Sequence, residues 1–259
     1  MILNSDEIIV ALAIKYQGDW NSIYAALTNP QDRDLDEYLR IAKKMKSKYV
    51  TILSEEYPRY LKECFKPPFV LFYYGDISLM QNIGKNVAVV GSRSCSEYGI
   101  KATEDIVGGI TDQYNIVSGL AIGIDSIAHN AAIDNGAKTI AVLPGGIDYC
   151  YPPSHKKIYN IIKKDHLLIS EIPGDSAPEQ ISFPIRNRII AGLSKTLLVT
   201  EAHPLSGTLT TVLLALEGNS DVMCVPYPVG DNSECNRLIM NGASLVENAD
   251  DVVDQMSKY

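Results

Sequence analysis

Arg186, Asn187 and Arg188 place two guanidinium groups and an amide inside an apolar stretch, FPIRNRIIAG at 183–192. The stretch comes just before residues 197–200, a short apolar run that is typical of a buried strand. A guanidinium group keeps its charge and is costly to bury without a partner. Two arginines in this setting therefore predict anionic contacts, such as a ligand phosphate or an internal carboxylate.

Three glycine-bearing turns elsewhere in the chain could form the rest of a phosphate site. Each follows a short apolar run and precedes a helix-like stretch, and together they contain Gly91, Ser92, Arg93, Ser118, Gly119, Gly123, Ser206, Gly207 and Thr208. In a parallel sheet such turns meet at the carboxyl edge and direct backbone N–H groups into one crevice. Taken alone, the Gly-Ser-Arg turn also suits a plain strand-to-helix connection with a solvated arginine.

A fourth turn, at 143–153, has the composition of a nucleic-acid contact. It contains Gly145, Gly146, Tyr149 and Tyr151. The glycines allow close backbone approach, and the tyrosine rings could stack on bases. Lys156 and Lys157 follow in the first turn of a predicted helix, where they oppose the helix macrodipole. They are placed either for an anion or as ordinary solvated lysines.

Two pairs of side chains have the chemistry for acid–base catalysis. Asp125 and His129 are four residues apart and share one face of a predicted helix. We interpret Asp125 as a cap of the helix start and His129 as a structural hydrogen-bonding group. Glu201 and His203 form the second pair. We expect a structural role for Glu201, because either it or Glu171 should form an ion pair with Arg186 or Arg188.

The pattern of apolar residues changes along the chain in a way that predicts a small helical segment followed by an α/β domain. Helical spacing predicts helices over 6–14, 20–27 and 35–45, with Ser5 as a cap and Asn29-Pro30 as a terminator, and further helical turns over 54–65. Beyond them, short apolar runs predict strands over 69–73, 87–90, 115–117, 139–143, 167–170, 197–200 and 222–226. Helix-like stretches lie between several strands, at 96–112, 123–135, 155–163 and 208–218.

Alternation of this kind predicts a doubly wound, mostly parallel sheet. We expect a small all-α domain over 1–66 and a Rossmann-like domain over 67–259. The apolar content of 46% is ordinary for a globular protein, and no apolar run is long enough to span a membrane. The N-terminus lacks the order of a signal peptide, so we expect a cytoplasmic protein.

The net charge of −8 excludes a general basic coat, so nucleic-acid binding requires a local patch. The five cysteines are dispersed without a CxxC pair, which indicates reduced thiols. No residues show metal-ligand spacing, and neither GxGxxG nor GxxxxGK[ST] occurs. We therefore expect no metal and no cofactor.

Taken together, these segments resemble the DNA processing protein A family, also called Smf. The resemblance runs from about residue 69 to about residue 251. It rests on VGSR at 90–93, SGLAIGID with AH at 118–129, TIAVLPGGIDYCYP at 139–152, LLISEIP at 167–173, FPIRNRIIAGLS at 183–194, SGTLTT at 206–211 and NRLIMNGA at 236–243. The N-terminal helices resemble, more weakly, the sterile-alpha-motif-like domain common in that family.

The resemblance implies an extended Rossmann-like fold that binds single-stranded DNA rather than a dinucleotide. It also implies a cytoplasmic homodimer that loads the RecA recombinase onto single strands in natural transformation, displacing or working beside single-strand-binding protein. The family's DNA-binding arginine falls on Arg93. A second basic contact falls on Pro153, where this sequence departs from the pattern, and Lys156 or Lys157 are the candidates to replace it. Many members carry a C-terminal winged-helix module, which we do not expect here.

A different class of function remains open on the same fold. Phosphoribohydrolases that resemble lysine decarboxylases share this Rossmann variant and also carry a PGG turn. Their PGGxGTxxE pattern is absent here, because PGG continues as Ile147-Asp148-Tyr149. The sequence thus favours a non-enzymatic DNA-binding protein, with binding or hydrolysis of a nucleotide-derived small molecule as the alternative.

Overall fold

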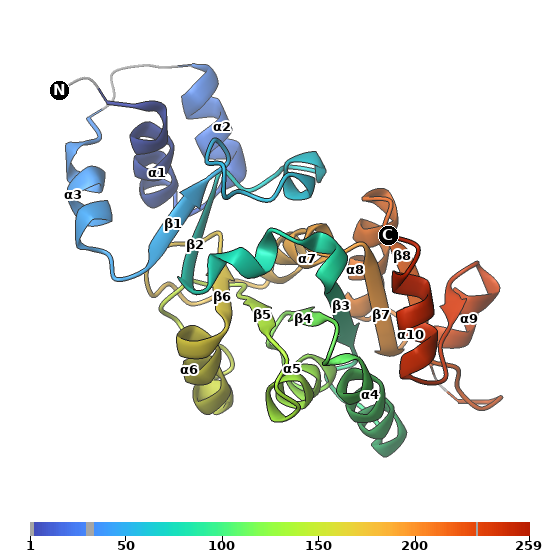
Figure 1. Cartoon of the computed structure of the whole chain (residues 1–259). Helices are drawn as coiled ribbons and strands as arrows, with labels where there is room; N and C mark the ends of the chain where they lie inside the picture. Colours follow the sequence, from blue (N-terminus) through green and yellow to red (C-terminus); the bar gives the residue numbers. More distant parts are fainter. Residues whose placement is uncertain (1–2, 30–33, 232) are drawn as a thin grey trace.

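The computed structural model describes residues 3–29, 34–231 and 233–259, and its centre is a single mixed sheet (Figure 1). Its strands in the described part of the chain are β1 (Lys48–Thr51), β2 (Val70–Gly75), β3 (Asn86–Gly91), β4 (Asn115–Ser118), β5 (Thr139–Val142), β6 (Leu167–Ser170), β7 (Thr196–Glu201), β8 (Asp221–Cys224) and β9 (Ser244–Leu245). They lie side by side in the order β1-β2-β6-β5-β4-β3-β7-β8-β9.

The sheet is parallel except at one end. The pairs β1–β2 and β2–β6 are antiparallel, and the pairs from β6 to β9 are parallel. All seven expected strands occur, within one or two residues at their ends. The expected fold class, an extended Rossmann-like sheet with helices before it, is therefore confirmed.

Helices cover both faces of the sheet. They are α1 (Ser5–Lys15), α2 (Trp20–Thr28), α3 (Asp36–Lys44), α4 (Glu97–Ile110), α5 (Ile124–Asp134), α6 (Lys156–Asp165), α7 (Ser182–Gly192), α8 (Gly207–Glu217), α9 (Cys235–Met240) and α10 (Ala249–Met256). Helices α4, α5 and α6 lie along one face, while α7 and α8 pack together across the other (Figure 1). Within the described ranges, none of these helices is long and apolar enough to cross a membrane.

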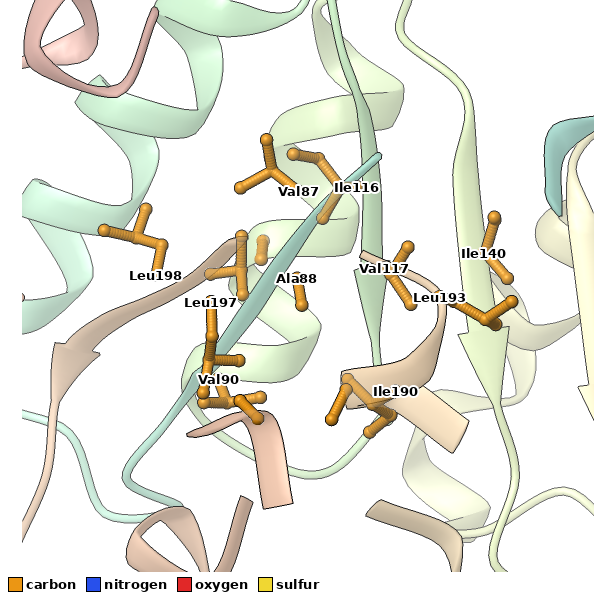
Figure 2. Close-up of a cluster of buried hydrophobic side chains, with 14 of the residues drawn as sticks. Val87, Ala88, Val90, Ile116, Val117, Ile140, Ile190, Leu193, Leu197 and Leu198 are labelled. Carbon is orange, nitrogen blue, oxygen red and sulfur yellow. The ribbon is translucent and has the colours of Figure 1, made fainter. Parts of the chain in front are cut away.

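The core lies where the central strands meet α7. Val87, Ala88 and Val90 of β3 are buried beside Leu197 and Leu198 of β7 (Figure 2). Ile190 near the end of α7, and Leu193 just after it, belong to the same cluster of buried apolar side chains (Figure 2). Apolar side chains on both faces explain why these strands read as continuous apolar runs rather than as alternating ones. The core therefore fixes α7, with its two arginines, against the carboxyl half of the sheet.

The N-terminal segment differs in two ways from the expected helices. Asn4, not Ser5, caps α1, and its side chain forms a capping box with Glu7. Residues 48–51, expected to lie in a wholly helical segment, instead form β1 and pair with β2, so that expectation is wrong there. Pro30, the expected terminator of α2, lies outside the described residues. The division into domains at residue 66 stays a prediction.

Several elements were not predicted from the sequence. Residues 54–65, expected to form a helical turn or two, contain one 3₁₀ turn, Tyr60–Glu63. Helices α7, α9 and α10 and the two-residue strand β9 had no counterpart in the sequence analysis. Of these, α7 matters most, because it carries Arg186, Asn187 and Arg188 and settles how they are oriented.

Candidate nucleic-acid interface

The strand order reverses beside β3, and a pocket lies at that place. From β3 the chain passes through β4, β5 and β6 on one side, and then returns to β7 on the other side. Ligands of open α/β sheets bind at the carboxyl ends of the strands next to such a reversal. A cavity of about 1100 Å³ lies here, lined by the turns after β3 and β7 and by the first half of α7. We call this cavity the first pocket.

The turn after β3 presents Arg93 to the first pocket. Ser92 is buried, and its hydroxyl group is used inside the turn, where it donates to the carbonyl of Ser94 over 2.9 Å. Arg93 is exposed, and its guanidinium carbon lies 4.9 Å from the ring centre of Phe183. Among the described residues, Arg93 forms no ion pair. The turn therefore offers one cation that is free to contact a ligand.

Two glycines allow the neighbouring turns to approach this closely. A Cβ atom on Gly91 would lie 2.5 Å from the side chain of Ile124. Gly123 has a φ of +84°, and a Cβ atom there would lie 2.3 Å from the carbonyl oxygen of Ser92. These glycines thus bring the turns after β3 and β4 into contact, whereas a direct contact with a ligand stays a prediction.

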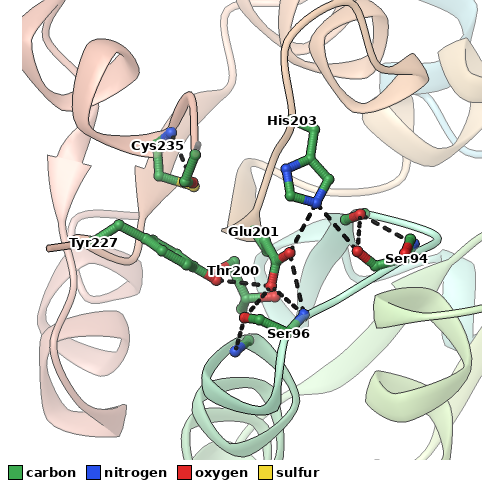
Figure 3. Close-up of polar contacts among 10 residues, drawn as sticks. Ser94, Ser96, Thr200, Glu201, His203, Tyr227 and Cys235 are labelled. Atoms are coloured by element: carbon green, nitrogen blue, oxygen red, sulfur yellow. Dashed lines mark hydrogen bonds and ion pairs between the residues drawn. The ribbon is translucent and has the colours of Figure 1, made fainter. Parts of the chain in front are cut away.

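Glu201, at the end of β7, fastens the turn after β3 in place (Figure 3). Its carboxylate is 1% exposed and accepts hydrogen bonds from the backbone N–H and the hydroxyl of Ser96, and from the hydroxyl of Tyr227. His203 Nε2 lies 3.1 Å from the same carboxylate and 3.1 Å from the carbonyl oxygen of Ser94. The expected alternative that Glu201 pairs with Arg186 or Arg188 is therefore wrong, because the end of β7 meets the end of β3 instead.

Arg186 lies at the floor of the first pocket. Its side chain is buried, and Nη1 donates to the carbonyl oxygens of Gly119, at 2.6 Å, and Val142. Nε donates to the side chain of Asn187, while no acceptor among the described residues bonds Nη2. Burial lowers the pKa of Arg186 to about 10, which leaves it charged at neutral pH. The carbonyl contacts orient this cation without neutralising it.

Asp125 is the carboxyl group that faces Arg186. Its Oδ2 atom accepts hydrogen bonds from the backbone N–H groups of Gly119 and Ala121, at 3.2 and 3.3 Å. We had expected Asp125 to cap α5. Its hydrogen bonds instead stabilise the loop before that helix. Burial raises the pKa of Asp125, and the charge of Arg186 opposes that rise. Asp125 is held by these contacts, which does not suit a proton-transfer role.

Arg188 faces the other side of α7 and is part of a buried ion pair. Its Nη2 atom lies 2.7 Å from both carboxylate oxygens of Glu171, and Nε donates to the carbonyl of Lys66 over 2.9 Å. Burial raises the pKa of Glu171, an effect that Arg188 opposes. The expectation that one arginine pairs with Glu171 is confirmed. Residues two apart on a helix point in nearly opposite directions, so only Arg186 reaches the first pocket.

Aromatic rings line the first pocket beside Arg93. Tyr151 and Phe183 meet edge to face, with ring centres 5.5 Å apart. Both side chains line the cavity, while Tyr149, named with Tyr151 as a possible base contact, does not. Phe183 was not singled out by the sequence analysis, although it begins the FPIRNR motif that carries the arginines. The combination of rings with cations is typical of sites that bind unpaired bases.

The turn after β7 leaves an orphaned hydroxyl group at the pocket. Ser206 precedes the first residue of α8, and its buried Oγ atom has no hydrogen-bond partner among the described residues. The first N–H groups of a helix also lack partners within the helix, and together with a hydroxyl group they suit an anion. Ser206, Gly207 and Thr208 all line the first pocket. This turn therefore has the groups that suit an anion, and a phosphate contact there stays a prediction.

Half of the sequence-predicted residues line the first pocket: Gly91, Ser92, Arg93, Arg186, Asn187, Ser206, Gly207 and Thr208. The other half do not: Ser118, Gly119, Gly123, Gly145, Gly146, Lys156, Lys157 and Arg188. Gly145 and Gly146 are buried against residues 174–178, and Lys156 lies over the ring of Tyr159. A DNA contact by these outlying residues stays a prediction.

His129 is structural, as we interpreted it. It is fully buried, and Nδ1 lies 2.7 Å from the hydroxyl oxygen of Thr139, while Nε2 has no partner in the part of the chain that the structure describes. Burial lowers the pKa of His129 to about 3. Across the described ranges, no group of three or more His, Cys, Asp or Glu residues could hold a metal ion.

This histidine makes stability depend on pH. In the unfolded chain it binds a proton near pH 6.5, whereas in the folded protein it stays neutral down to about pH 3. The free energy of unfolding should therefore have its full value above pH 6.5. It should decrease as the pH is lowered from there, by up to about 1.4 kcal/mol per pH unit. Urea unfolding at a series of pH values measures this slope.

His129→Asn is the matched variant, because its amide can still donate to Thr139 but does not titrate. Its slope between pH 6 and pH 4 should be smaller than that of the natural protein. Some slope should remain, since burial also lowers the pKa of His166. Identical slopes in the two proteins would contradict the assignment to His129.

The fold and the first pocket define a Rossmann-like α/β protein with a crevice at the strand reversal that is lined by two arginines. Residues 48–257 match the model of the DNA recombination-mediator protein A family. The chain belongs to this family.

Curated relatives give the same result. The chain is 43% identical over 205 residues to the DNA processing protein DprA of Streptococcus pneumoniae, covering 78% of this chain and 72% of that protein. It is 36% identical over 210 residues to DprA of Bacillus subtilis, covering 80% and 70%. For the protein Smf of Synechocystis the identity is 39% over 215 residues, covering 81% and 54%.

Solved structures of the family share the fold. The X-ray structure of DNA processing protein A from S. pneumoniae superposes with a TM-score of 0.84 at 34% identity, covering 98% of both chains. DNA processing protein A from Helicobacter pylori, for which a single-stranded DNA binding mode is described, gives a TM-score of 0.74 at 27% identity. That comparison covers 82% of this chain and 96% of the other.

Proposed function

We propose that this protein binds single-stranded DNA in the first pocket. The observation that carries the proposal is the placement of two cations on one cavity with little to neutralise them. Arg93 lies close enough to Arg186 to lower its pKa, and Asp125, the carboxyl group opposite, already accepts two backbone hydrogen bonds. A bound phosphate would relieve the repulsion between the two guanidinium groups. The DNA-binding mode of the H. pylori relative supports the same reading.

The contacts in the pocket suit one strand rather than two. Phe183 and Tyr151 offer ring faces and edges to unpaired bases, which a duplex keeps stacked inside itself. The net charge of −8 provides no broad basic surface for the two backbones of a duplex. The site therefore distinguishes strands by base accessibility more than by charge.

A direct measurement tests this preference. We expect oligo-dT to bind more tightly than a duplex of equal length at moderate salt, in gel-shift titrations run at several salt concentrations. Equal or tighter binding of the duplex would contradict the proposal.

We further propose that the protein acts without catalysis, as a homodimer that loads RecA onto incoming single strands in natural transformation, beside or in place of single-strand-binding protein. The family's designation as a recombination mediator supports this role. The corresponding readout is the rate at which RecA filaments nucleate on strands coated with single-strand-binding protein. A protein that loads RecA onto DNA works in the cytoplasm, so we propose a cytoplasmic location for this protein.

The alternative, a phosphoribohydrolase-type enzyme, fits the cavity less well. Gly145 and Gly146, which would approach a nucleotide in such an enzyme, are packed against residues 174–178 and do not line the first pocket. The carboxyl group of Asp125 is held by two backbone amides. Incubation with nucleoside monophosphates separates the two functions, since a hydrolase would release the free base.

A further inference from the structure

A second cleft lies on the opposite side of α7 from the first pocket. It has a volume of about 700 Å³ and is lined by residues of α7 and of the connection that joins α1 to α2. Ile181, Pro184, Arg186 and Thr210 line both cavities, so the two adjoin at the start of α7. Its volume is within the range of ligand sites, and its lining is largely apolar.

Aromatic rings and one cation line the outer wall of this second cleft. The Trp20 ring stacks on Tyr24 and on Phe69, with ring centres 5.0 and 5.3 Å away, and its indole N–H donates to the carbonyl of Pro67. The Lys66 ammonium lies 5.3 Å from the Trp20 ring and 5.5 Å from the ring of Phe65. Phe65 is 70% exposed. Tyr24 and Phe69 cover the two faces of Trp20. The exposed Phe65 ring, beside the Lys66 ammonium, is therefore the ring on which a base can stack.

The charges of the second cleft do not favour phosphate strongly. Arg188 is neutralised there by Glu171, while Asp19 and Glu179 add negative charge at the edges. Lys66 therefore offers the main accessible cation. Affinity in this cleft must come from ring contacts, whereas affinity in the first pocket comes from arginines.

We propose that the strand held in the first pocket crosses the start of α7 and places its following bases in the second cleft, on the Phe65 ring beside Trp20. This inference rests on the proposed function, because it concerns the path of the same strand. The lining residues shared with the first pocket favour nucleic acid over an apolar peptide as the occupant. The N-terminal helical segment thereby becomes part of the DNA-binding surface.

The intrinsic fluorescence of the protein tests this path without any substitution. The chain has one tryptophan, Trp20, and the Lys66 ammonium lies against both its ring and that of Phe65. A base stacked on Phe65 should therefore quench the whole tryptophan signal. In an oligo-dT series from about 4 to about 20 nucleotides, we expect the shortest strands to bind without quenching and longer strands to quench. Binding of long strands with no change in fluorescence would overturn the inference.

Phe65→Ala removes the ring on which a base would stack. Because Phe65 is exposed, the substitution should have little effect on folding. We expect at least a fivefold weaker affinity for long oligo-dT, an unchanged affinity for the shortest strands and an unchanged salt dependence. Phe65→Trp should restore tight binding. Leu53→Ala, an exposed apolar residue that lines neither cavity, is the matched control and should bind normally.

The outcomes separate this inference from the proposed function. If Phe65→Ala binds strands of all lengths normally while Arg93→Ala binds them weakly, the second cleft does not bind the strand and the first pocket still does. If neither variant changes DNA binding, the proposed function itself is overturned. Normal DNA affinity with impaired RecA nucleation in Phe65→Ala would also overturn the inference and assign the cleft to a protein partner.

Discussion

Replacing Arg188 by alanine is expected to lower the free energy of unfolding by about 3–5 kcal/mol, because it leaves the Glu171 carboxylate buried without its partner. For a chain of this size the melting temperature should fall by roughly 6–20 °C. Differential scanning calorimetry measures the change. The DNA affinity of the folded fraction should stay close to that of the natural protein, since Arg188 does not line the first pocket.

Two controls make this result specific to the buried pair. The double variant Glu171→Leu with Arg188→Met should recover most of the lost stability, because an apolar pair of similar size replaces two buried charges. Arg237→Ala removes an exposed partner of Glu234 and should change stability by less than about 1 kcal/mol. A loss in Arg188→Ala no larger than that in Arg237→Ala would contradict the role given to the pair.

The second large effect is expected in DNA binding. Arg93→Ala should weaken single-strand binding by about 10- to 100-fold, the range of a charge-assisted hydrogen bond to phosphate, without changing the melting temperature. Its exposed side chain makes no ion pair within the described residues, so its removal leaves no buried group unsatisfied. Fluorescence anisotropy with labelled oligo-dT gives the affinity.

The salt dependence of the same variant identifies the kind of contact. Loss of one phosphate contact should reduce the slope of log affinity against log salt by about 0.7. Arg93→Lys keeps the charge but not the paired donors, so it should keep the slope and lose part of the affinity. A folded Arg93→Ala that binds like the natural protein would show that the turn is only structural.

The fold could be predicted from the sequence because the buried strands are short apolar runs separated by helices. Such runs indicate that both faces of the sheet are covered, and this fixes a doubly wound architecture. Strand β1 was not predicted, because only Val50 and Thr51 among its residues are buried and a lysine-rich stretch precedes it. Edge strands of this kind carry little of the pattern on which such a prediction depends.

Helix α7 and the partner of Glu201 could not be predicted for reasons of packing. Helix α7 lies between the sheet and two cavities, so buried residues occur around it and no polar face marks it as amphipathic. Glu201 is close in sequence to the two arginines, yet its strand pairs with β3, where Gly91 lies opposite. Only the strand order, which the sequence pattern does not contain, brings Glu201 to Ser96.

The attachment of the β3 turn to Glu201 and His203 has a consequence for the kinetics of binding. The segment from Ser92 to Ser96 is already held by hydrogen bonds before any strand arrives. Little protein then has to become ordered on encounter, so the entropic cost of binding falls mainly on the DNA. Variants that keep this attachment should therefore bind single-stranded DNA with similar association rate constants. Their differences in affinity should lie in the dissociation rate constant.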